Sequence, residues 1–442
     1  MLLGTQRVNS RGHLEVGGCD TVDLARRFGT PLYVIDEATV RANCRSYRAA
    51  FESRYPRTDV SFAGKAFLTT AMARLVAQEG LGLDVASAGE LYTAIKADFP
   101  AEKLLFHGNN KSAAELELAF QYNVGRIVVD NFHELAMLAA MARDKKSSRK
   151  ILLRVAPGVD PHTHRLIRTG QEDTKFGFNI KNGDALSAVR QALEAAPHIQ
   201  LAGIHCHIGS QLLDASTHVE AIDVMVGFIR SLKDATGWSA QELDIGGGLG
   251  IRYLAEQLPP TLDDFATTVI ASLKDAFARY DVDEPALLLE PGRSIVGEAG
   301  LTLYTIGAIK TVPIPEDPGQ RIYVAIDGGM SDNPRPQLYE SVYSALVASK
   351  ATLPADTVAT IAGKHCETDI LIWNTPIAEP KPGDVLAVQS TGAYNYAMAS
   401  NYNRFTKPAC VFVLDGQADL VSERETLDDV VRLDRVPERL WT

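Results

Sequence analysis

The stretch Leu201-Ala-Gly-Ile-His-Cys-His-Ile-Gly-Ser210 joins a short apolar run to a polar turn that contains glycine. Comparable runs recur along the chain, and stretches with apolar residues at helical spacing separate them, for example 71–78 and 115–121. The seven further runs are 60–63, 83–86, 104–107, 127–130, 151–155, 243–245 and 287–290. Because each parallel crossover needs a helix, eight strands alternating with helices predict a parallel (β/α)8 TIM-type barrel.

The sequence pattern changes after Arg293. Four segments look like short strands with turn residues between them and without regular helical spacers: 321–327, 357–362, 384–389 and 409–415. This pattern predicts a C-terminal antiparallel β domain, a sandwich or a barrel. The first 32 residues fit no barrel position and are expected to join that domain. The predicted division is therefore 1–32, 33–293 for the barrel, and 294–442 for the β domain.

Composition limits the function classes. The chain has 442 residues, 46% of them hydrophobic and 22% charged, which is typical of a globular protein with two domains. A formal charge of −11 argues against a nucleic-acid or anionic-membrane partner. No long apolar run and no N-terminal signal pattern are visible, so we expect a cytoplasmic protein. Five scattered cysteines without a Cys-x-x-Cys pair predict neither a disulfide framework nor structural zinc.

The strand ends carry the candidate chemistry, because barrel active sites lie at the C-terminal ends of the strands. Lys65 ends the first strand, either as a cation extending to solvent or as a desolvated amine that forms a Schiff base. Glycines 246–248 and Gly292 follow the last two strands, where barrels often bind phosphate, although a glycine triplet also fits a tight turn. Glu290 beside them suits a protonated pyridine nitrogen. Together these residues predict pyridoxal phosphate (PLP).

The histidines could instead form a metal site. His205 and His207 alternate on one strand and could share a face, but a zinc barrel needs more ligands and only His107 offers one. We therefore predict no metal. His207 is expected to pack against the cofactor and Ser210 to donate to its phosphate, while the pair at 162 and 164 lies in a polar loop and is expected to be solvated.

Blocks along nearly the whole chain match a known family pattern. In the barrel they are Phe62-Ala-Gly-Lys65-Ala, Gly82-Leu-Asp-Val-Ala-Ser87-Ala-Gly-Glu90-Leu, His107-Gly-Asn-Asn-Lys111, 170–177, Gly203-Ile-His-Cys-His207-Ile-Gly-Ser-Gln211, Asp244-Ile-Gly-Gly-Gly248-Leu-Gly and Glu290-Pro-Gly-Arg293-Ser. In the β domain they are Asp327-Gly-Gly-Met-Ser-Asp-Asn-Pro-Arg335-Pro-Gln-Leu-Tyr339, Gly363-Lys-His-Cys366-Glu367 and Gly392-Ala-Tyr394. With these blocks the chain resembles the PLP-dependent group IV decarboxylases, which have an alanine-racemase-like barrel and a β domain.

The resemblance implies a role for each matching residue. Lys65 would form the Schiff base, Glu290 would face the pyridine nitrogen, and Cys366 would protonate the carbanion left after carbon dioxide departs. The implied cofactor-binding residues are Lys65, Asp84, Arg154, His207, Ser210, Gly247, Gly248, Glu290, Gly292, Arg293 and Tyr394.

Within the family the resemblance is strongest to enzymes that convert meso-2,6-diaminopimelate to L-lysine and carbon dioxide, the last step of lysine biosynthesis. Arg293 and Arg335 can bind the distal carboxylate of that substrate with forked hydrogen bonds. The resemblance also implies substrate contacts from Tyr339, Glu367 and Tyr394. It further implies a homodimer in which Cys366 and Glu367 reach the active site of the other subunit.

Three rival functions remain open on the sequence alone. The first is a decarboxylase of the same fold for arginine, ornithine or carboxynorspermidine; the others are a non-catalytic PLP carrier and a metal-dependent barrel hydrolase. The sequence also differs at two places from the residues usual in the family. Phe62 and Phe67 replace the more usual Tyr and Asn around the lysine, and Thr368-Asp369 shortens the turn after Cys366-Glu367.

Overall fold

The computed structural model describes residues 2–159, 171–315 and 318–441, and these form two compact units. A barrel unit comprises Arg41–Ile251 and Gln257–Ile295. A β unit comprises Met1–Val40, Arg252–Glu256 and Val296–Thr442. Each unit has its own hydrophobic core, so each is described by itself. The predicted division after residues 32 and 293 stays a prediction.

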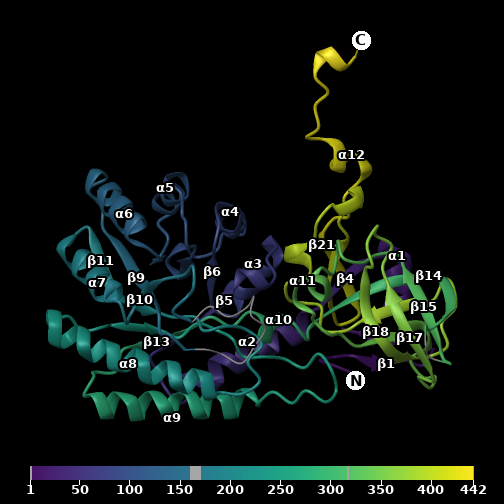
Figure 1. Ribbon diagram of the computed structural model, residues 1–442, viewed down its shortest axis with the longest axis horizontal. Helices are drawn as coiled ribbons and strands as arrows, with labels where there is room; N and C mark the ends of the chain where they lie inside the picture. The colour runs from purple at the N-terminus through teal and green to yellow at the C-terminus, as the bar shows by residue number, and fades with distance from the viewer. Residues whose placement is uncertain (1, 160–170, 316–317, 442) are drawn as a thin grey trace. The chain divides into compact units, whose positions relative to one another are not determined.

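The barrel unit is a closed ring of eight parallel strands, as predicted (Figure 1). Neighbouring strands pair in chain order, and the last pairs with the first through Leu289 and Val60. The strands are β5 (Thr58–Ala63), β6 (Gly82–Val85), β7 (Leu104–Phe106), β8 (Arg126–Val129), β9 (Arg149–Ala156), β11 (Ile199–His205), β12 (Glu242–Asp244) and β13 (Ala286–Leu289). All eight coincide with the apolar runs, and the short β10 (Phe178–Asn179) adds to β9 outside the ring.

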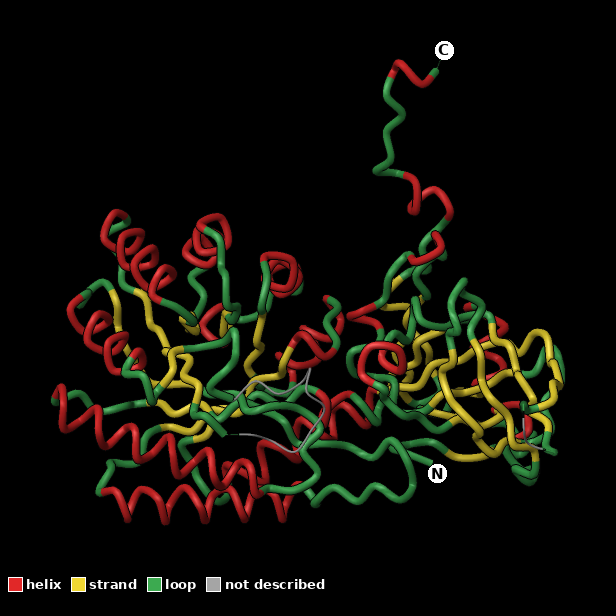
Figure 2. The backbone as a smooth tube through the Cα atoms, in the orientation of Figure 1, coloured by secondary structure: helices red, strands yellow, loops and turns green. Residues whose placement is uncertain are grey.

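Helices surround this ring, and Figure 2 shows them outside the strands. They are α2 (Glu37–Glu52), α3 (Thr70–Gln78), α4 (Ala88–Lys96), α5 (Ala113–Gln121), α6 (Phe132–Asp144), α7 (Asp184–Glu194), α8 (Ser216–Thr236), α9 (Leu262–Tyr280) and the short α10 (Arg293–Val296). Several begin at a side chain that accepts the first free backbone N–H groups, such as Ser87, Ser112 and Asn131. Each of these capping residues ends the short loop that follows a barrel strand, so it sets the length of that loop.

The inside of the ring is filled by side chains and forms a packed core. Leu105, Val128, Leu152, Ala202 and Leu288 make one buried cluster from five strands. Inward layers of apolar side chains of this kind close a barrel of eight strands. The polar groups of the strands are therefore confined to the two ends of the ring.

The β unit contains a nine-stranded sheet with the order β18-β17-β15-β14-β4-β20-β21, and β19 joins β14 to β16. The strands are β4 (Leu32–Asp36), β14 (Gly300–Pro313), β15 (Gln320–Ile326), β16 (Ala345–Val347), β17 (Thr357–Ala362), β18 (Ile370–Ile377), β19 (Val385–Val388), β20 (Ala409–Leu414) and β21 (Gln417–Ser422). A small sheet of β1 (Arg7–Val8), β2 (Leu14–Val16) and β3 (Cys19–Asp20) precedes α1 (Thr21–Phe28). Two short helices, α11 (Arg335–Tyr339) and α12 (Leu427–Val431), complete the unit.

Most pairs in this sheet are antiparallel, as predicted, but β15–β17 and β4–β20 run parallel. No hairpin links the two partners of either parallel pair, because other strands lie between them in the sequence. The alternation of apolar and polar residues within a strand does not indicate whether its neighbour runs parallel or antiparallel. The strand β4 precedes the barrel in sequence and pairs with β14 and β20, which draws the N-terminal segment into the β unit.

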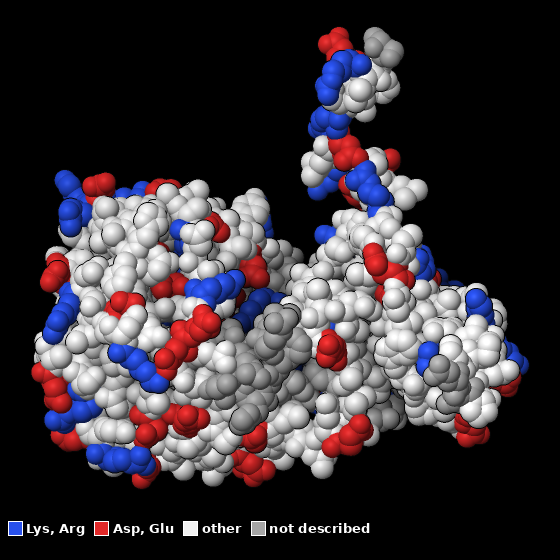
Figure 3. All heavy atoms as spheres, in the orientation of Figure 1, with Lys and Arg blue, Asp and Glu red and all other residues white. Residues whose placement is uncertain are grey.

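Charged residues of both signs are interspersed over the face drawn in Figure 3. Pairs such as Lys145 with Glu117 and Arg279 with Asp223 lie 2.7 and 2.6 Å apart. Such exposed pairs contribute little stability. Within the described ranges, no helix combines the length and the apolar character needed to cross a membrane.

Candidate active site

The C-terminal rim of the barrel brings the predicted barrel residues together, because the carboxyl ends of parallel strands lie at one end of the ring. Lys65 lies in the turn Gly64–Ala66 directly after β5, and its side chain is exposed. Its charge acts on Asp84 in β6 and on His207 after β11. Burial and the charges of Lys65 and Arg154 hold the pKa of His207 well below its usual range.

The two departures near the lysine are both buried aromatic residues. Phe62 and Phe67 are fully buried on either side of Lys65 in the sequence. They therefore supply apolar packing behind the turn and leave the exposed amine at the rim.

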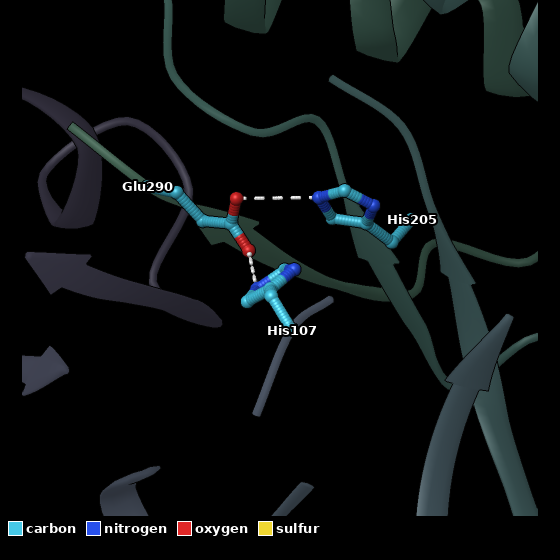
Figure 4. Close-up of side chains that lie close together, drawn as sticks. All are labelled: His107, His205 and Glu290. Atoms are coloured by element: carbon cyan, nitrogen blue, oxygen red, sulfur yellow. Dashed lines mark hydrogen bonds and ion pairs between the residues drawn. The ribbon is translucent and has the colours of Figure 1, made fainter. Parts of the chain in front are cut away.

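Glu290 is the centre of the buried polar cluster. Its Oε1 lies 2.7 Å from Nε2 of His107, and its Oε2 lies 3.2 Å from Nε2 of His205. Figure 4 shows each ring facing its own carboxylate oxygen. Burial alone would raise the pKa of Glu290, but the two imidazoles outweigh it and hold that pKa well below its usual range. Glu290 is therefore ionised.

Two further carboxyl groups adjoin Glu290. Asp84 and Asp244 are buried, and burial together with the charge of Glu290 raises the pKa of both well above the usual range. Like charges in one dry site cannot all ionise. Of these three carboxyl groups, Glu290 is the one whose pKa is lowered, whereas burial and the charge of Glu290 raise the pKa of the other two.

By residue type, His107, His205 and Glu290 could also hold a metal ion, since their ligand atoms lie within 4.8 Å of one another. The orientation favours direct contacts with the carboxylate instead, because each Nε2 faces a different oxygen of Glu290 (Figure 4). The histidines at 162 and 164 lie outside the described residues.

The glycines after β12 and β13 are required by close packing. Gly246 and Gly248 have φ values of +69° and +121°, and a Cβ on Gly248 would lie 2.8 Å from the carbonyl oxygen of Gly209. A Cβ on Gly247 would collide with the backbone oxygen of Glu290, and one on Gly292 would lie 3.0 Å from Ala63. Glycine is therefore required at these turns by the backbone conformation and by close contacts within the protein.

Arg293 and Ser210 meet at this edge. The Nε and Nη2 of Arg293 donate to the Ser210 Oγ at 3.2 and 2.9 Å. The guanidinium is buried, with the residue 4% exposed. Ser210 and the Arg293 guanidinium thus lie together at this edge of the rim.

Arg154 at the end of β9 is oriented by two contacts. Its Nε lies 3.9 Å from Asp130, and its guanidinium lies 4.2 Å from the centre of the Phe176 ring. Asp130 also accepts the backbone N–H of Gly177 at 3.1 Å. Asp130 therefore anchors both the predicted cofactor residue and the chain that returns after residue 170.

In the β unit, Arg335 and the two predicted tyrosines form a group. The Arg335 guanidinium lies 4.9 Å from the ring centre of Tyr339 and 5.2 Å from that of Tyr394. The residue is 4% exposed, and its buried Nε has no hydrogen-bond acceptor among the residues that the structure describes. A buried donor of this kind, held between two rings, is suited to an anionic ligand.

Cys366 and Glu367 form the exposed tip of the loop between β17 and β18. The N–H of Cys366 donates to the side chain of Asn403 at 3.0 Å, and Glu367 accepts from the hydroxyl of Tyr402 at 2.6 Å. The shortened turn is fixed by Asp369, which is 1% exposed. Its carboxylate accepts from the His365 ring at 2.7 Å, and its φ is 45°. The turn is thus well defined despite its unusual length.

The sequence interpretation missed several members of these groups. His205, a candidate metal ligand by sequence, is hydrogen-bonded to Glu290, and His107 lies 2.7 Å from the other oxygen of the same carboxylate. Asp244 and Asp130 both come at strand ends, the signal that could have found them. Asp369 and Tyr402 are recognisable only in the folded β unit.

Comparisons with known proteins show the family of the chain. A family model described as pyridoxal-dependent decarboxylase, pyridoxal binding domain, matches residues 37–297. The barrel, the rim lysine and this match define the class: the chain belongs to the pyridoxal-dependent decarboxylases. PLP is accordingly its cofactor, and the chain is a PLP-dependent carboxy-lyase, as predicted.

Relatives that match nearly the whole chain identify the family within this class of decarboxylases. A diaminopimelate decarboxylase of Bacillus subtilis is 48% identical over 434 residues, 98% of both chains. The diaminopimelate decarboxylase of M. jannaschii, solved with L-lysine, has a TM-score of 0.92 at 35% identity and covers 100% of both chains. That of Helicobacter pylori, also solved with L-lysine, has a TM-score of 0.83 at 30% identity and covers 94% of this chain and 99% of its own. The chain belongs to the diaminopimelate decarboxylase family, which confirms the resemblance.

Proposed function

We propose that this chain catalyses the reaction of its family, the PLP-dependent conversion of meso-2,6-diaminopimelate to L-lysine and carbon dioxide, the last step of lysine biosynthesis. The observation that carries the proposal is the buried, ionised Glu290 at the barrel rim that also holds Lys65. The relatives solved with L-lysine, the product of this reaction, support the choice of substrate.

The cofactor fits the groups at the rim. Lys65 would bind its aldehyde carbon, Glu290 would keep its ring nitrogen protonated, and the backbone of the glycine loops with Ser210 would hold its phosphate. Bound there, PLP supplies an electron sink for the pair left when the carboxylate departs. The other residues proposed to contact it are Asp84, Arg154, His207, Gly247, Gly248, Gly292, Arg293 and Tyr394.

The other proposed role of the site residues is to select the substrate. Arg335, with its unsatisfied buried donor, would bind the distal carboxylate together with Arg293 and Tyr339. Glu367 would accept from the distal ammonium, and Tyr394 would contact both substrate and cofactor. A substrate without a distal carboxylate would leave the arginines unpaired, at the desolvation cost of buried charge.

A substrate panel tests this choice. Purified protein with PLP is expected to release carbon dioxide from meso-diaminopimelate with a kcat/KM at least about 100-fold higher than from ornithine or arginine, because unpaired buried groups penalise those substrates. A preference for ornithine or arginine would reject the proposal in favour of a related decarboxylase.

We also propose that Cys366 donates the proton that completes the reaction. Cys366 and Glu367 are exposed at a loop tip, whereas proton transfer needs a site shielded from water. The proposed homodimer would remove this exposure to water, since the second subunit would cover the loop tip. The requirement for a free thiol also supports the proposed location in the reducing cytoplasm, as all five cysteines are free.

Replacing Cys366 with alanine is expected to lower kcat by about 10²-fold, the usual effect of losing a general acid, with PLP affinity unchanged. Thr368→Ala, an exposed neighbour in the same turn, is the control and should keep the parental rate. Mixing the inactive Cys366→Ala and Lys65→Ala proteins should restore about a quarter of the activity if the site is shared between two-fold-related subunits. Wild-type turnover in Cys366→Ala would exclude the proposed proton donor, and no restoration on mixing would exclude the shared site.

Replacing Arg335 with lysine keeps the charge but removes the planar fork. We expect KM for meso-diaminopimelate to rise about 10- to 100-fold, because bidentate hydrogen bonds to a charged group are lost. Arg321→Lys is the matched control, since Arg321 in the same unit also stacks on an aromatic ring, that of Trp373 at 5.2 Å. Equal KM values in both variants would remove Arg335 from the substrate site.

A further inference from the structure

Two histidines that no assigned role uses converge on Glu290. His107 follows β7 and His205 ends β11, and their ring centres lie 5.0 Å apart in an edge-to-face arrangement. The side chains of His107, His205 and Glu290 are 12%, 1% and 8% exposed. Water therefore has little access to the contacts between them.

The tautomers follow from this geometry. An ionised carboxylate can only accept, so His205 donates to Glu290 through the Nε2 that faces it at 3.2 Å. The Nε2 of His107 makes a polar contact of 2.7 Å with the other carboxylate oxygen. The Nδ1 of His205 is buried and has no hydrogen-bond partner among the described residues, which fits a bare nitrogen without a proton. Burial lowers the pKa of His205 to about 4 and also lowers that of His107, so both rings are neutral near pH 7.

Neutral donors have a specific advantage at this position. A lysine or arginine would fix the carboxylate equally well but would cancel its charge, and the charge is what keeps a ring nitrogen protonated. Two imidazoles contact one carboxylate oxygen each and add no charge. They also limit rotation of the carboxylate, because both oxygens are held from different strands (Figure 4).

We propose that His107 and His205 are positioning residues that fix the orientation and the single negative charge of Glu290 and do not touch the substrate. This inference rests on the proposed role of Glu290 opposite the cofactor nitrogen. The two residues act as second-layer partners of the kind that commonly orient a reactive group.

Paired substitutions separate a positioning role from a packing role. Glutamine places a neutral N–H donor at about the reach of His Nε2, whereas leucine fills the space without a donor. We expect His107→Leu and His205→Leu each to lower kcat by about 10- to 100-fold, the effect of losing a hydrogen bond to a charged group. His107→Gln and His205→Gln should stay within about 3-fold of the parent for the same reason.

The decisive readout is the ¹⁵N chemical shift of the ring nitrogen in protein loaded with ¹⁵N-labelled PLP. The parent and the glutamine variants should give the protonated signal, and the leucine variants should shift toward the unprotonated one. In a Glu290→Gln background the leucine substitutions should change kcat less than about 2-fold, because residues that act through one group are not additive. Circular dichroism and thermal unfolding confirm that each variant is folded.

A protonated signal in the folded leucine variants, or equal losses in leucine and glutamine variants, would overturn the inference. If a leucine variant does not fold, the glutamine variants decide, since loss of the protonated signal there contradicts donation from Nε2. Failure of the underlying proposal looks different: a parental ¹⁵N signal in Glu290→Gln itself would show that Glu290 does not face the ring nitrogen.

Discussion

Replacing Lys65 with alanine is expected to lower kcat by more than about 10³-fold and to remove the visible absorbance that lysine-bound PLP gives. Lys65 is the exposed amine that follows β5 at the barrel rim. Its charge acts on Asp84 in β6 and on His207 just after β11, so it lies where a cofactor in the barrel mouth can reach it. Alanine retains the turn but offers no nucleophile.

The matched control is Lys96→Ala, an exposed lysine at the end of α4 on the outside of the barrel. It should keep parental absorbance and turnover. Absorption spectra of the PLP-loaded proteins and initial rates with meso-diaminopimelate are sufficient for the comparison. A Lys65→Ala protein with the parental spectrum would show that another amine binds the cofactor.

Replacing Glu290 with glutamine is expected to lower kcat by about 10³-fold, the loss typical when a fixed group that stabilises developing charge is removed. The substitution conserves shape but removes the one carboxylate of the buried cluster whose pKa is lowered. The ring nitrogen would then lose its proton and the cofactor its capacity to accept electrons.

The control for this prediction is Glu117→Gln, an exposed glutamate on α5 that pairs with Lys145 on the surface. Surface pairs of this kind contribute little, so its kcat and its PLP affinity should equal those of the parent. Parental turnover in Glu290→Gln would contradict the assignment of the ring-facing carboxylate.

Much of the barrel was predictable from the sequence, because each strand is a short apolar run between helical patterns. The strand-end rule then located Lys65, Asp84 and Glu290 without any knowledge of contacts. The same rule did not show that His107 and His205 meet on Glu290, because convergence depends on which strands face each other across the ring and on the rotamers.

The β unit was harder to predict. Short strands were recognisable, but the parallel pairing of β4 with β20 joins residues nearly 400 positions apart and leaves no local trace. The role of Asp369 was also invisible, since the shortened turn after Glu367 is stabilised by a carboxylate that inserts beside Gly363 and Gly329. Such contacts belong to tertiary packing, which no local pattern specifies.

The central claim is that this chain makes L-lysine from meso-diaminopimelate with PLP. The most direct measurement is the formation of L-lysine by purified protein, before and after removal of PLP and again after its restoration. We expect L-lysine to form only when PLP is present, in amounts that match the carbon dioxide released. Bound PLP without lysine formation would contradict the proposed reaction.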